Sequence, residues 1–419
     1  MTAYETLFSW IADNAPPAPR IYVAGCSGEP QGLSAYLAKN PSAAQNATFM
    51  GVWIPGVNRT DYAGLHETAR SELIFQSADF RPSFEAGRSA FRPLSYTQAW
   101  RWLEIAAIDV AIAMISSPDA AGAATLGVSA DFTPALLARD DVRKVAVINK
   151  RMPAPTDSVA VDRAAFDLVI EADDPLLAYV AGDTPPLFTA IAERIAVLID
   201  DGDTVQFGLG NVQLAVLRAL SAKKNLRIHS GMISDPVLDA VDAGSIAAAP
   251  RAITTGTALG TEPLYDFCAD DKRIAFRPVS YTHSITTLAA IDRFAAINSV
   301  IEVDLFGQAN AEFIGGRQIS GAGGLVDFLR GAAASTGGKP ILALASTARG
   351  GAVSRIVPHL SAPATSVSRA DVGFVVTEHG HADLRGLSIE ERATALIAIA
   401  APSHRAALKA AWTDIERTL

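Results

Sequence analysis

The sequence predicts an α/β protein built from two similar domains with mainly parallel sheets. Three observations lead to this prediction: the composition, the alternation of short apolar runs with helical patterns, and a ten-residue segment that occurs almost twice. The chain has 419 residues, of which 49% are hydrophobic and 19% charged. This length exceeds one ordinary core, and the balance of residues is typical of a folded globular protein. Two domains are therefore expected.

The charge pattern excludes several classes of partner. The formal net charge is -9, which gives no basic field for nucleic acid. The start of the chain lacks a basic segment, and no uncharged stretch reaches transmembrane length. The two cysteines, Cys26 and Cys268, form no CxxC motif. We therefore expect a cytoplasmic protein without nucleic-acid or membrane partners.

Short apolar runs alternate with helical patterns along both halves of the chain. The runs are rich in β-branched residues and lead into turns that contain Gly or Pro. This alternation predicts parallel sheets flanked by helices. Strands are expected at residues 21–24, 145–148, 168–170, 341–344 and 374–376, and helices at 185–198, 211–220 and 389–400.

The clearest internal repeat pairs residues 88–97 (RSAFRPLSYT) with residues 273–282 (RIAFRPVSYT), 185 positions later. Two weaker similarities pair 25–31 with 208–213 and 167–173 with 373–379. The weaker pairs are equally well explained by the general likeness of apolar strands and Gly turns, but the ten-residue repeat is not. The two halves are therefore expected to share one fold.

The segment 182–186 (GDTPP) interrupts the pattern before a new helix begins. We therefore predict an N-terminal domain of residues 1–184 and a C-terminal domain of residues 185–419. The active site is expected in the cleft between the two domains, because functional sites favour such clefts.

One acidic residue in the second half follows an apolar strand. Residues 297–310 (INSVIEVDLFGQAN) place Glu302 between Ile301 and Val303. A regular strand would direct Glu302 away from its apolar neighbours. An edge-strand acid that faces solvent is the better explanation of this segment taken alone. Asp304 lies two residues after Glu302, so a regular strand would direct its side chain to the same face. It either helps to orient a site or is solvated.

A glycine cluster follows at residues 320–330 (SGAGGLVDFLR), directly before a probable helix. Backbone N–H groups exposed by such glycines can bind a phosphate or an oxyanion. The cluster is not a Walker A loop, because no Gly-Lys-Ser/Thr follows it. Gly208 and Gly210 form a weaker signal, for which an ordinary turn is the alternative.

Residues 297–330 resemble the signature of the acetyl-CoA hydrolase/transferase family, which includes 4-hydroxybutyrate, butyrate and succinate CoA-transferases. The resemblance implies a NagB/RpiA/CoA-transferase-like fold in which Glu302 forms a glutamyl-CoA thioester. One departure is Gly231, where relatives of the 4-hydroxybutyrate type carry a glutamate. Other segments agree with the family in the same order: 54–59 (IPGVNR), 87–88, 276–283 (FRPVSYTH), 354–358 (SRIVP), 368–371 (SRAD), 375–380 (VVTEHG), 383–386 (DLRG) and 391–393 (ERA).

The resemblance also implies binding residues around Glu302. For His283 a surface position is an equally good alternative. Glu378 with His379 and His381 could form a metal cluster, but the family explains this segment without one, so we expect coenzyme A as a substrate and no metal. The implied oxyanion or CoA-binding residues are Gly321, Gly323, Gly324, Val279, Ser280, Tyr281, Thr282 and His283, and further substrate contacts are Glu378, Gly380, Gly208, Gly210 and Ser366.

The function that the resemblance implies is the transfer of CoA between a short-chain acyl-CoA and a carboxylate. Hydrolysis of acyl-CoA by the same nucleophile is the main alternative, and a non-catalytic CoA or sugar-phosphate sensor is the remote one. The expected partners are acyl-CoA and a small carboxylate, and a homodimer is the expected assembly. The sequence leaves open which carboxylate is used and how transfer is balanced against hydrolysis.

Overall fold

The structure is a computed structural model that describes residues 1–180, 182 and 184–419. The chain divides into two compact units. The first contains residues 1–180, 231–235 and 253–282, and the second contains the other described residues. Ala181 and Asp183, which fall in the expected join between domains, lie outside the described residues. The expected limits of 1–184 and 185–419 stay a prediction.

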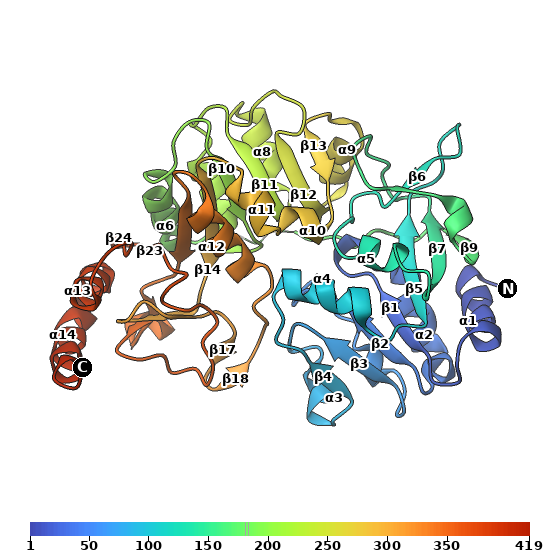
Figure 1. Ribbon diagram of the computed structural model, residues 1–419, viewed down its shortest axis with the longest axis horizontal. Coiled ribbons are helices and arrows are strands. Elements are labelled where there is room, and N and C mark those ends of the chain that lie inside the picture. The colour runs from blue at the N-terminus through green and yellow to red at the C-terminus, as the bar shows by residue number, and fades with distance from the viewer. Residues whose placement is uncertain (181, 183) are drawn as a thin grey trace. The chain divides into compact units, whose positions relative to one another are not determined.

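A seven-stranded parallel sheet forms the centre of the first unit, in the order β4-β3-β2-β1-β5-β7-β9 (Figure 1). Alternate side chains enter different core clusters: Ile21 and Val23 pack with α1 and α2, and Tyr22 packs with α4. Because both faces are covered, all six residues of β5 are buried. The bounds are β1 Arg20–Val23, β2 Thr48–Gly51, β3 Arg70–Leu73, β4 Ser89–Phe91, β5 Val110–Ile115, β7 Arg143–Asn149, β9 Leu168–Ala172, α1 Ala3–Asn14, α2 Gln31–Lys39, α3 Arg81–Glu85, α4 Tyr96–Ile105 and α5 Thr133–Leu137.

The second large sheet has the order β13-β12-β11-β10-β14-β19-β23-β24. Phe294 of β14 packs with α11 and α12, and Leu342 of β19 packs with α13. Only the short hairpin partner β24 runs antiparallel among the pairings described for this sheet. The bounds are β10 Thr204–Phe207, β11 Arg227–Ile233, β12 Ile253–Ala258, β13 Ile274–Phe276, β14 Phe294–Ser299, β19 Lys339–Ala343, β23 Phe374–Thr377, β24 Gly380–Asp383, α6 Pro186–Ala196, α7 Asn211–Ala219, α8 Pro236–Asp242, α9 Glu262–Asp270, α10 Val279–Thr282, α11 Ile285–Ala289, α12 Leu325–Ala334, α13 Ile389–Ile399 and α14 Pro402–Glu416.

Short strands complete the described chain. The segment after β14 enters a three-stranded sheet in the order β16-β15-β22. A hairpin, β17–β18, then leads to the glycine cluster before α12. The bounds are β15 Glu302–Asp304, β16 Ala309–Asn310, β17 Phe313–Ile314, β18 Arg317–Gln318, β22 Ile356–Val357, β6 Ala124–Thr125, β8 Ala160–Val161, β20 Thr347–Ala348 and β21 Val353–Ser354.

The expected strands and helices are confirmed, and local sequence explains several helix starts. Helices α1, α4 and α13 each begin with a capping box, in which the side chains of Thr2, Ser95 and Ser388 accept from the backbone three residues later. Helices α6 and α14 begin with Pro at the first helical position, where its missing N–H costs least.

The two large sheets share one topology, which confirms the expectation of similar halves. The repeated decapeptide covers β4 in one sheet and β13 in the other, each an edge strand. The two weaker similarities pair β1 with β10 and β9 with β23, which hold equivalent places in the two strand orders. All three similarities are therefore structural, including the two that the sequence left undecided.

In the second sheet the chain reverses its strand order beside β10. The next strand, β11, lies on one side of β10, and β14 lies on the other. Ligands of open parallel sheets bind outside the carboxyl ends of the strands at such a reversal. The segments that follow β10 and β14 are therefore the first places to look for a site.

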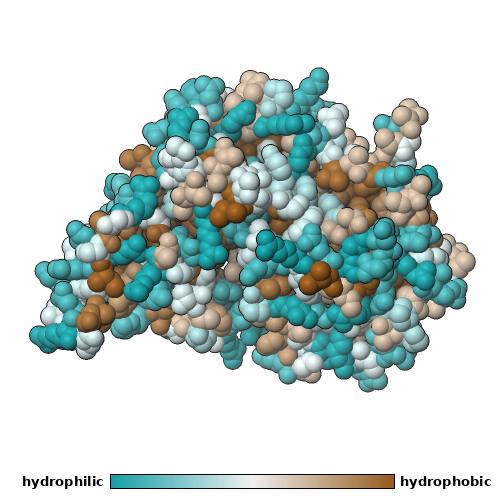
Figure 2. All heavy atoms as spheres, viewed as in Figure 1, coloured by the Kyte–Doolittle hydropathy of each residue, from teal (hydrophilic) through white to brown (hydrophobic). Residues whose placement is uncertain are grey.

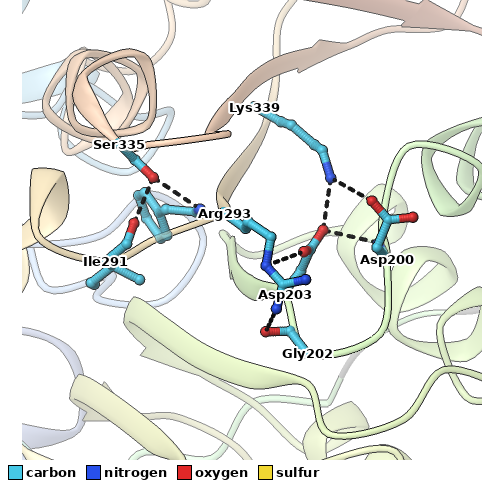
Figure 3. Close-up of polar contacts among 8 residues, drawn as sticks. Asp200, Gly202, Asp203, Ile291, Arg293, Ser335 and Lys339 are labelled. Atoms are coloured by element: carbon cyan, nitrogen blue, oxygen red, sulfur yellow. Dashed lines mark hydrogen bonds and ion pairs between the residues drawn. The ribbon is translucent and has the colours of Figure 1, made fainter.

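At the amino ends of β10 and β19, a buried carboxylate joins the strands (Figure 3). The side chain of Asp203 is fully buried, and its Oδ2 accepts from Lys339 Nζ at 2.8 Å and from the Asp200 N–H at 2.9 Å. Arg293 Nε lies 3.5 Å from Asp203 Oδ1. This cluster lies at the amino ends of the strands, whereas ligands of such sheets bind beyond the carboxyl ends. We therefore assign it a structural role.

The visible face carries mainly hydrophilic residues, with apolar residues in small groups between them (Figure 2). Within the described part of the chain, no helix combines the length and apolar character needed to cross a bilayer.

Candidate active site

Glu302 follows the carboxyl end of β14 and begins β15. The Val300 N–H donates to Ala343 O at 3.1 Å and the Ile301 N–H to Asn310 O at 2.7 Å, which fixes the path from one sheet to the other. Val303 and Leu305 are fully buried in the core, and Glu302 is half-buried. Because β15 is the middle strand of its sheet, the edge-strand alternative is wrong.

Three hydrogen bonds hold the Glu302 carboxylate. Ser361 Oγ donates to Oε1 at 2.6 Å, and the Ser361 N–H donates to Oε2 at 3.3 Å. Asn310, which faces Glu302 across the β15–β16 pair, donates from Nδ2 to Oε2 at 3.5 Å. Sequence reasoning missed Ser361, because it lies 59 positions downstream in a loop without a motif.

Asp304 is buried and organises the turn after β15. Its Oδ1 accepts from the N–H groups of Phe306 at 3.1 Å and Gln308 at 2.9 Å, and its Oδ2 accepts from Gln308 Nε2 at 2.9 Å. The alternative that Asp304 is solvated is therefore wrong. Its position supports Glu302 through the turn between β15 and β16, which ends next to Asn310.

The glycine cluster forms the amino end of α12, which begins at Leu325. Gly323 has a φ of +55°, a conformation that favours glycine. A Cβ on Gly324 would lie 2.4 Å from His283 Nε2, so the ring of His283 leaves room there only for glycine. Gly323 is buried and Gly324 is partly exposed, so the two glycines differ in how far solvent reaches their backbone.

His283 is only 2% exposed, so the surface alternative is wrong. Its ring lies 4.3 Å from the ring of Phe328, between ring centroids. Burial and, to a smaller extent, the neighbouring His229 together lower the pKa of His283 to about 3. The imidazole is therefore neutral beside the positive end of α12, where a cation would be unfavourable.

The lowered pKa of His283 predicts a loss of stability in acid. Below pH 6.5 the His283 imidazole is protonated in the unfolded chain, but in the folded chain it stays neutral down to about pH 3. The folded state therefore loses stability as the pH falls through this range. Between pH 7.5 and 5 this group alone is expected to cost about 2 kcal/mol. The free energy of unfolding should fall less over that interval in His283→Gln than in the wild type. Equal falls would contradict the prediction.

Two further predicted residues, Glu378 and Gly380, lie at the same end of the sheet. Glu378 follows β23, and its Oε2 and Oε1 accept from Ser346 N–H at 2.9 Å and Ser346 Oγ at 2.5 Å. Ser346 follows β19, the neighbour of β14. Gly380 has a φ of +150° at the start of β24. The Ser346–Glu378 pair thus joins the ends of two strands beside the one that leads to Glu302.

Gly208 and Gly210 lie in the turn after β10, on the other side of β14. The amide of Gln213 bridges this turn to β14 when its Nε2 donates to Leu209 O at 2.9 Å and Gly210 O at 3.2 Å, while its Oε1 accepts from Ser299 Oγ at 3.2 Å. Gly208 and Gly210 therefore lie at the reversal point of the sheet, next to the strand β14 that leads to Glu302.

Ser366 is connected to Glu302 indirectly, through the buried Glu312 and Asn310. Ser366 Oγ donates to Glu312 Oε2 at 2.7 Å and accepts from the Ala311 N–H at 3.0 Å. The Glu312 N–H donates to Asn310 Oδ1 at 3.0 Å. Ser366 is thus engaged by the protein itself, and its substrate contact stays a prediction.

The predicted CoA-binding segment 279–282 belongs to the first unit, whereas Glu302 and the glycine cluster belong to the second. The side chains of Val279 and Thr282 are buried, and Val279 joins a core cluster. Only Ser280 and Tyr281 expose their side chains. A direct ligand contact from the side chains of Val279 and Thr282 therefore conflicts with their burial.

The first unit also contains a cavity of about 480 Å³. It is lined in part by Arg59, from the family-like segment 54–59, and by the buried Glu29. Burial raises the pKa of Glu29, although Asn58 Nδ2 and the Tyr62 hydroxyl each donate to its carboxylate at 2.8 Å. The first unit therefore has a partly polar cavity next to the family-like segment 54–59.

Comparison with known proteins identifies the family. Residues 2–180 match the acetyl-CoA hydrolase/transferase N-terminal domain, and residues 260–412 match the C-terminal domain. The 4-hydroxybutyrate coenzyme A transferase of Clostridium kluyveri is 37% identical over 93% of this chain and 92% of its own length. The butyryl-CoA:acetate CoA-transferase of Anaerostipes caccae is 33% identical over 91% and 89%.

Solved structures agree with the sequence relatives. RipA from Yersinia pestis has a TM-score of 0.89 and 28% identity, covering 99% of this chain and 97% of its own. A 4-hydroxybutyrate CoA-transferase from Porphyromonas gingivalis has a TM-score of 0.79 and 30% identity, covering 100% and 97%. With the shared two-sheet topology and a carboxylate at the reversal point, these matches show that the chain is an enzyme of the CoA-transferase type and belongs to the acetyl-CoA hydrolase/transferase family.

Proposed function

We propose that the enzyme moves CoA between a short-chain acyl-CoA and a carboxylate through a glutamyl-CoA thioester on Glu302. The observation that carries this proposal is the half-buried carboxylate of Glu302 after β14, held by Ser361 and Asn310 at the reversal point of the sheet. A carboxylate that is held in one orientation at the carboxyl ends of the strands, where ligands of such sheets bind, is suited to nucleophilic attack. Named relatives that act on acyl-CoA support the same reaction.

In the proposed reaction, one oxygen of Glu302 attacks the thioester carbonyl carbon, and the C–S bond breaks to give a mixed anhydride and CoA thiolate. The thiolate then attacks the Glu302 carbonyl carbon. This second step forms the glutamyl-CoA thioester and releases the acyl group as a carboxylate that keeps the attacking oxygen. A second carboxylate reverses both steps and leaves as the new acyl-CoA.

The tetrahedral intermediates carry an oxyanion that needs hydrogen-bond donors. Backbone N–H groups of Gly323 and Gly324, at the amino end of the ten-residue helix α12, would supply donors and positive potential of this kind. We assign them this role because the His283 ring and the positive φ of Gly323 hold their backbone in one conformation.

Hydrolysis is the second candidate, because water can replace the acceptor carboxylate at the same intermediate. Acetyl-CoA hydrolase of Kluyveromyces lactis is 32% identical over 46% of this chain and 37% of its own length. The shorter match makes transfer the better supported activity.

The balance of the two activities can be measured directly. Free CoA release from acetyl-CoA and butyryl-CoA, and formation of new acyl-CoA, should be followed with and without acetate, butyrate or 4-hydroxybutyrate. Transfer predicts new acyl-CoA that depends on the acceptor. CoA release at one rate with every acceptor, and without new acyl-CoA, would refute the transferase and favour the hydrolase.

A further inference from the structure

Ser361 belongs to a loop that is attached at both ends to the strands around Glu302. Before the loop, the Val303 N–H donates to Arg355 O at 2.9 Å and the Leu305 N–H to Val357 O at 3.0 Å. After the loop, the N–H groups of Ser366 and Val367 both donate to Ala309 O at 3.0 Å. Because β15 lies between these attachments, the loop holds Ser361 over the Glu302 carboxylate.

Ser361 contacts both oxygens of the carboxylate, with different donors. Its hydroxyl donates to Oε1 at 2.6 Å, and its backbone N–H donates to Oε2 at 3.3 Å. The terminal torsion of a glutamate is broad, but two donors from one residue restrict its rotation. Asn310 adds a third, longer bond to Oε2 and is itself fixed, since its Nδ2 also donates to Phe313 O at 2.9 Å.

We propose that Ser361 is a positioning residue, whose hydroxyl fixes the plane of the Glu302 carboxylate for attack on the thioester. The inference rests on the proposed function, because only a nucleophilic Glu302 needs a lone pair aimed at the substrate carbon. Each carboxylate oxygen has two lone-pair directions, so one bond from the hydroxyl leaves Oε1 able to react. Hydrogen bonds to a charged acceptor are short and strong, which suits this restraint.

The test compares Ser361→Ala with Ser361→Thr, which keeps the hydroxyl. Ser368→Ala is the matched control: Ser368 lies seven positions downstream and is exposed, and the only described contact of its hydroxyl is the bond that it accepts from the Ala370 N–H. Each variant is assayed with acyl-CoA and a carboxylate, and the glutamyl-CoA thioester at Glu302 is followed by quenching, borohydride reduction and mass spectrometry. Melting temperatures report the fold.

Ser361→Ala should lower kcat and the rate of thioester formation together by about tenfold or more, with the KM for acyl-CoA within about twofold. Ser361→Thr should recover most of the loss, and Ser368→Ala should match the wild type. A kcat of Ser361→Ala at or above the wild-type value, or a higher KM at unchanged kcat, would overturn the positioning role. If wild-type enzyme turns over without any thioester at Glu302, the proposed function itself fails and the inference fails with it.

Discussion

Replacing Glu302 with glutamine is expected to lower CoA transfer by on the order of 10⁴-fold or more, because an amide cannot form the anhydride or the thioester. Glutamine has nearly the same shape, and Glu302 is half-buried in the middle strand of its sheet. The fold should therefore be kept. Initial rates of acyl-CoA formation, together with mass spectrometry after borohydride reduction, would measure both the loss of activity and the loss of the labelled peptide.

Asp304→Asn is the matched control for this variant. Asp304 lies two positions along the same strand and has the same parity, but its carboxylate is used by the turn. The control should lose about 1–2 kcal/mol of stability and keep kcat within a few fold. An active Glu302→Gln enzyme, or reduction at another residue, would remove Glu302 from the mechanism. Full biological activity of a Glu302→Ala variant that has lost transfer would favour a sensor.

Local patterns in the sequence were sufficient for the α/β class, the mainly parallel sheets and the likeness of the two halves, but not for the order of the strands. Parallel strands buried on both faces leave continuous apolar runs, as in β5 and β19, and a repeated edge strand marked the two sheets as equivalent. The position of Glu302 at a strand end was also visible. Its chemistry came from the family resemblance, because a lone carboxylate after a strand has the same local pattern whether it reacts or is solvated.

The surroundings of Glu302 could not be predicted, because they depend on contacts between distant segments. Ser361 reaches the carboxylate from a loop whose own sequence has no motif, and its position follows from the pairing of β15 with β22. The burial of His283 depends on the packing of its ring against Gly324 and Phe328. No local pattern separates such a histidine from one on the surface.

Lys339→Met is expected to destabilise the protein by about 3–5 kcal/mol, the largest structural effect among these predictions. Lys339 Nζ donates to the fully buried Asp203 at 2.8 Å and to Asp200, which is 71% exposed, at 3.2 Å (Figure 3). Without the ammonium group, the Asp203 carboxylate keeps only Arg293 as a cationic partner among the described residues, at 3.5 Å. Denaturant unfolding of the variant and the wild type gives the difference.

The exposed partner provides the control, because Asp200→Asn removes the other ion pair of Lys339 and leaves the pair with Asp203 in place. That change should cost below about 1 kcal/mol, as solvent screens an exposed pair. The double variant Asp203→Asn/Lys339→Met should recover part of the loss, since the cost of Lys339→Met arises from an uncompensated buried charge rather than from the missing methylene contacts. Equal losses in Lys339→Met and Asp200→Asn would contradict this account. Recovery in the double variant would show that the buried carboxylate requires its cation where it joins β10 and β19, the two neighbours of the strand β14 that leads to Glu302.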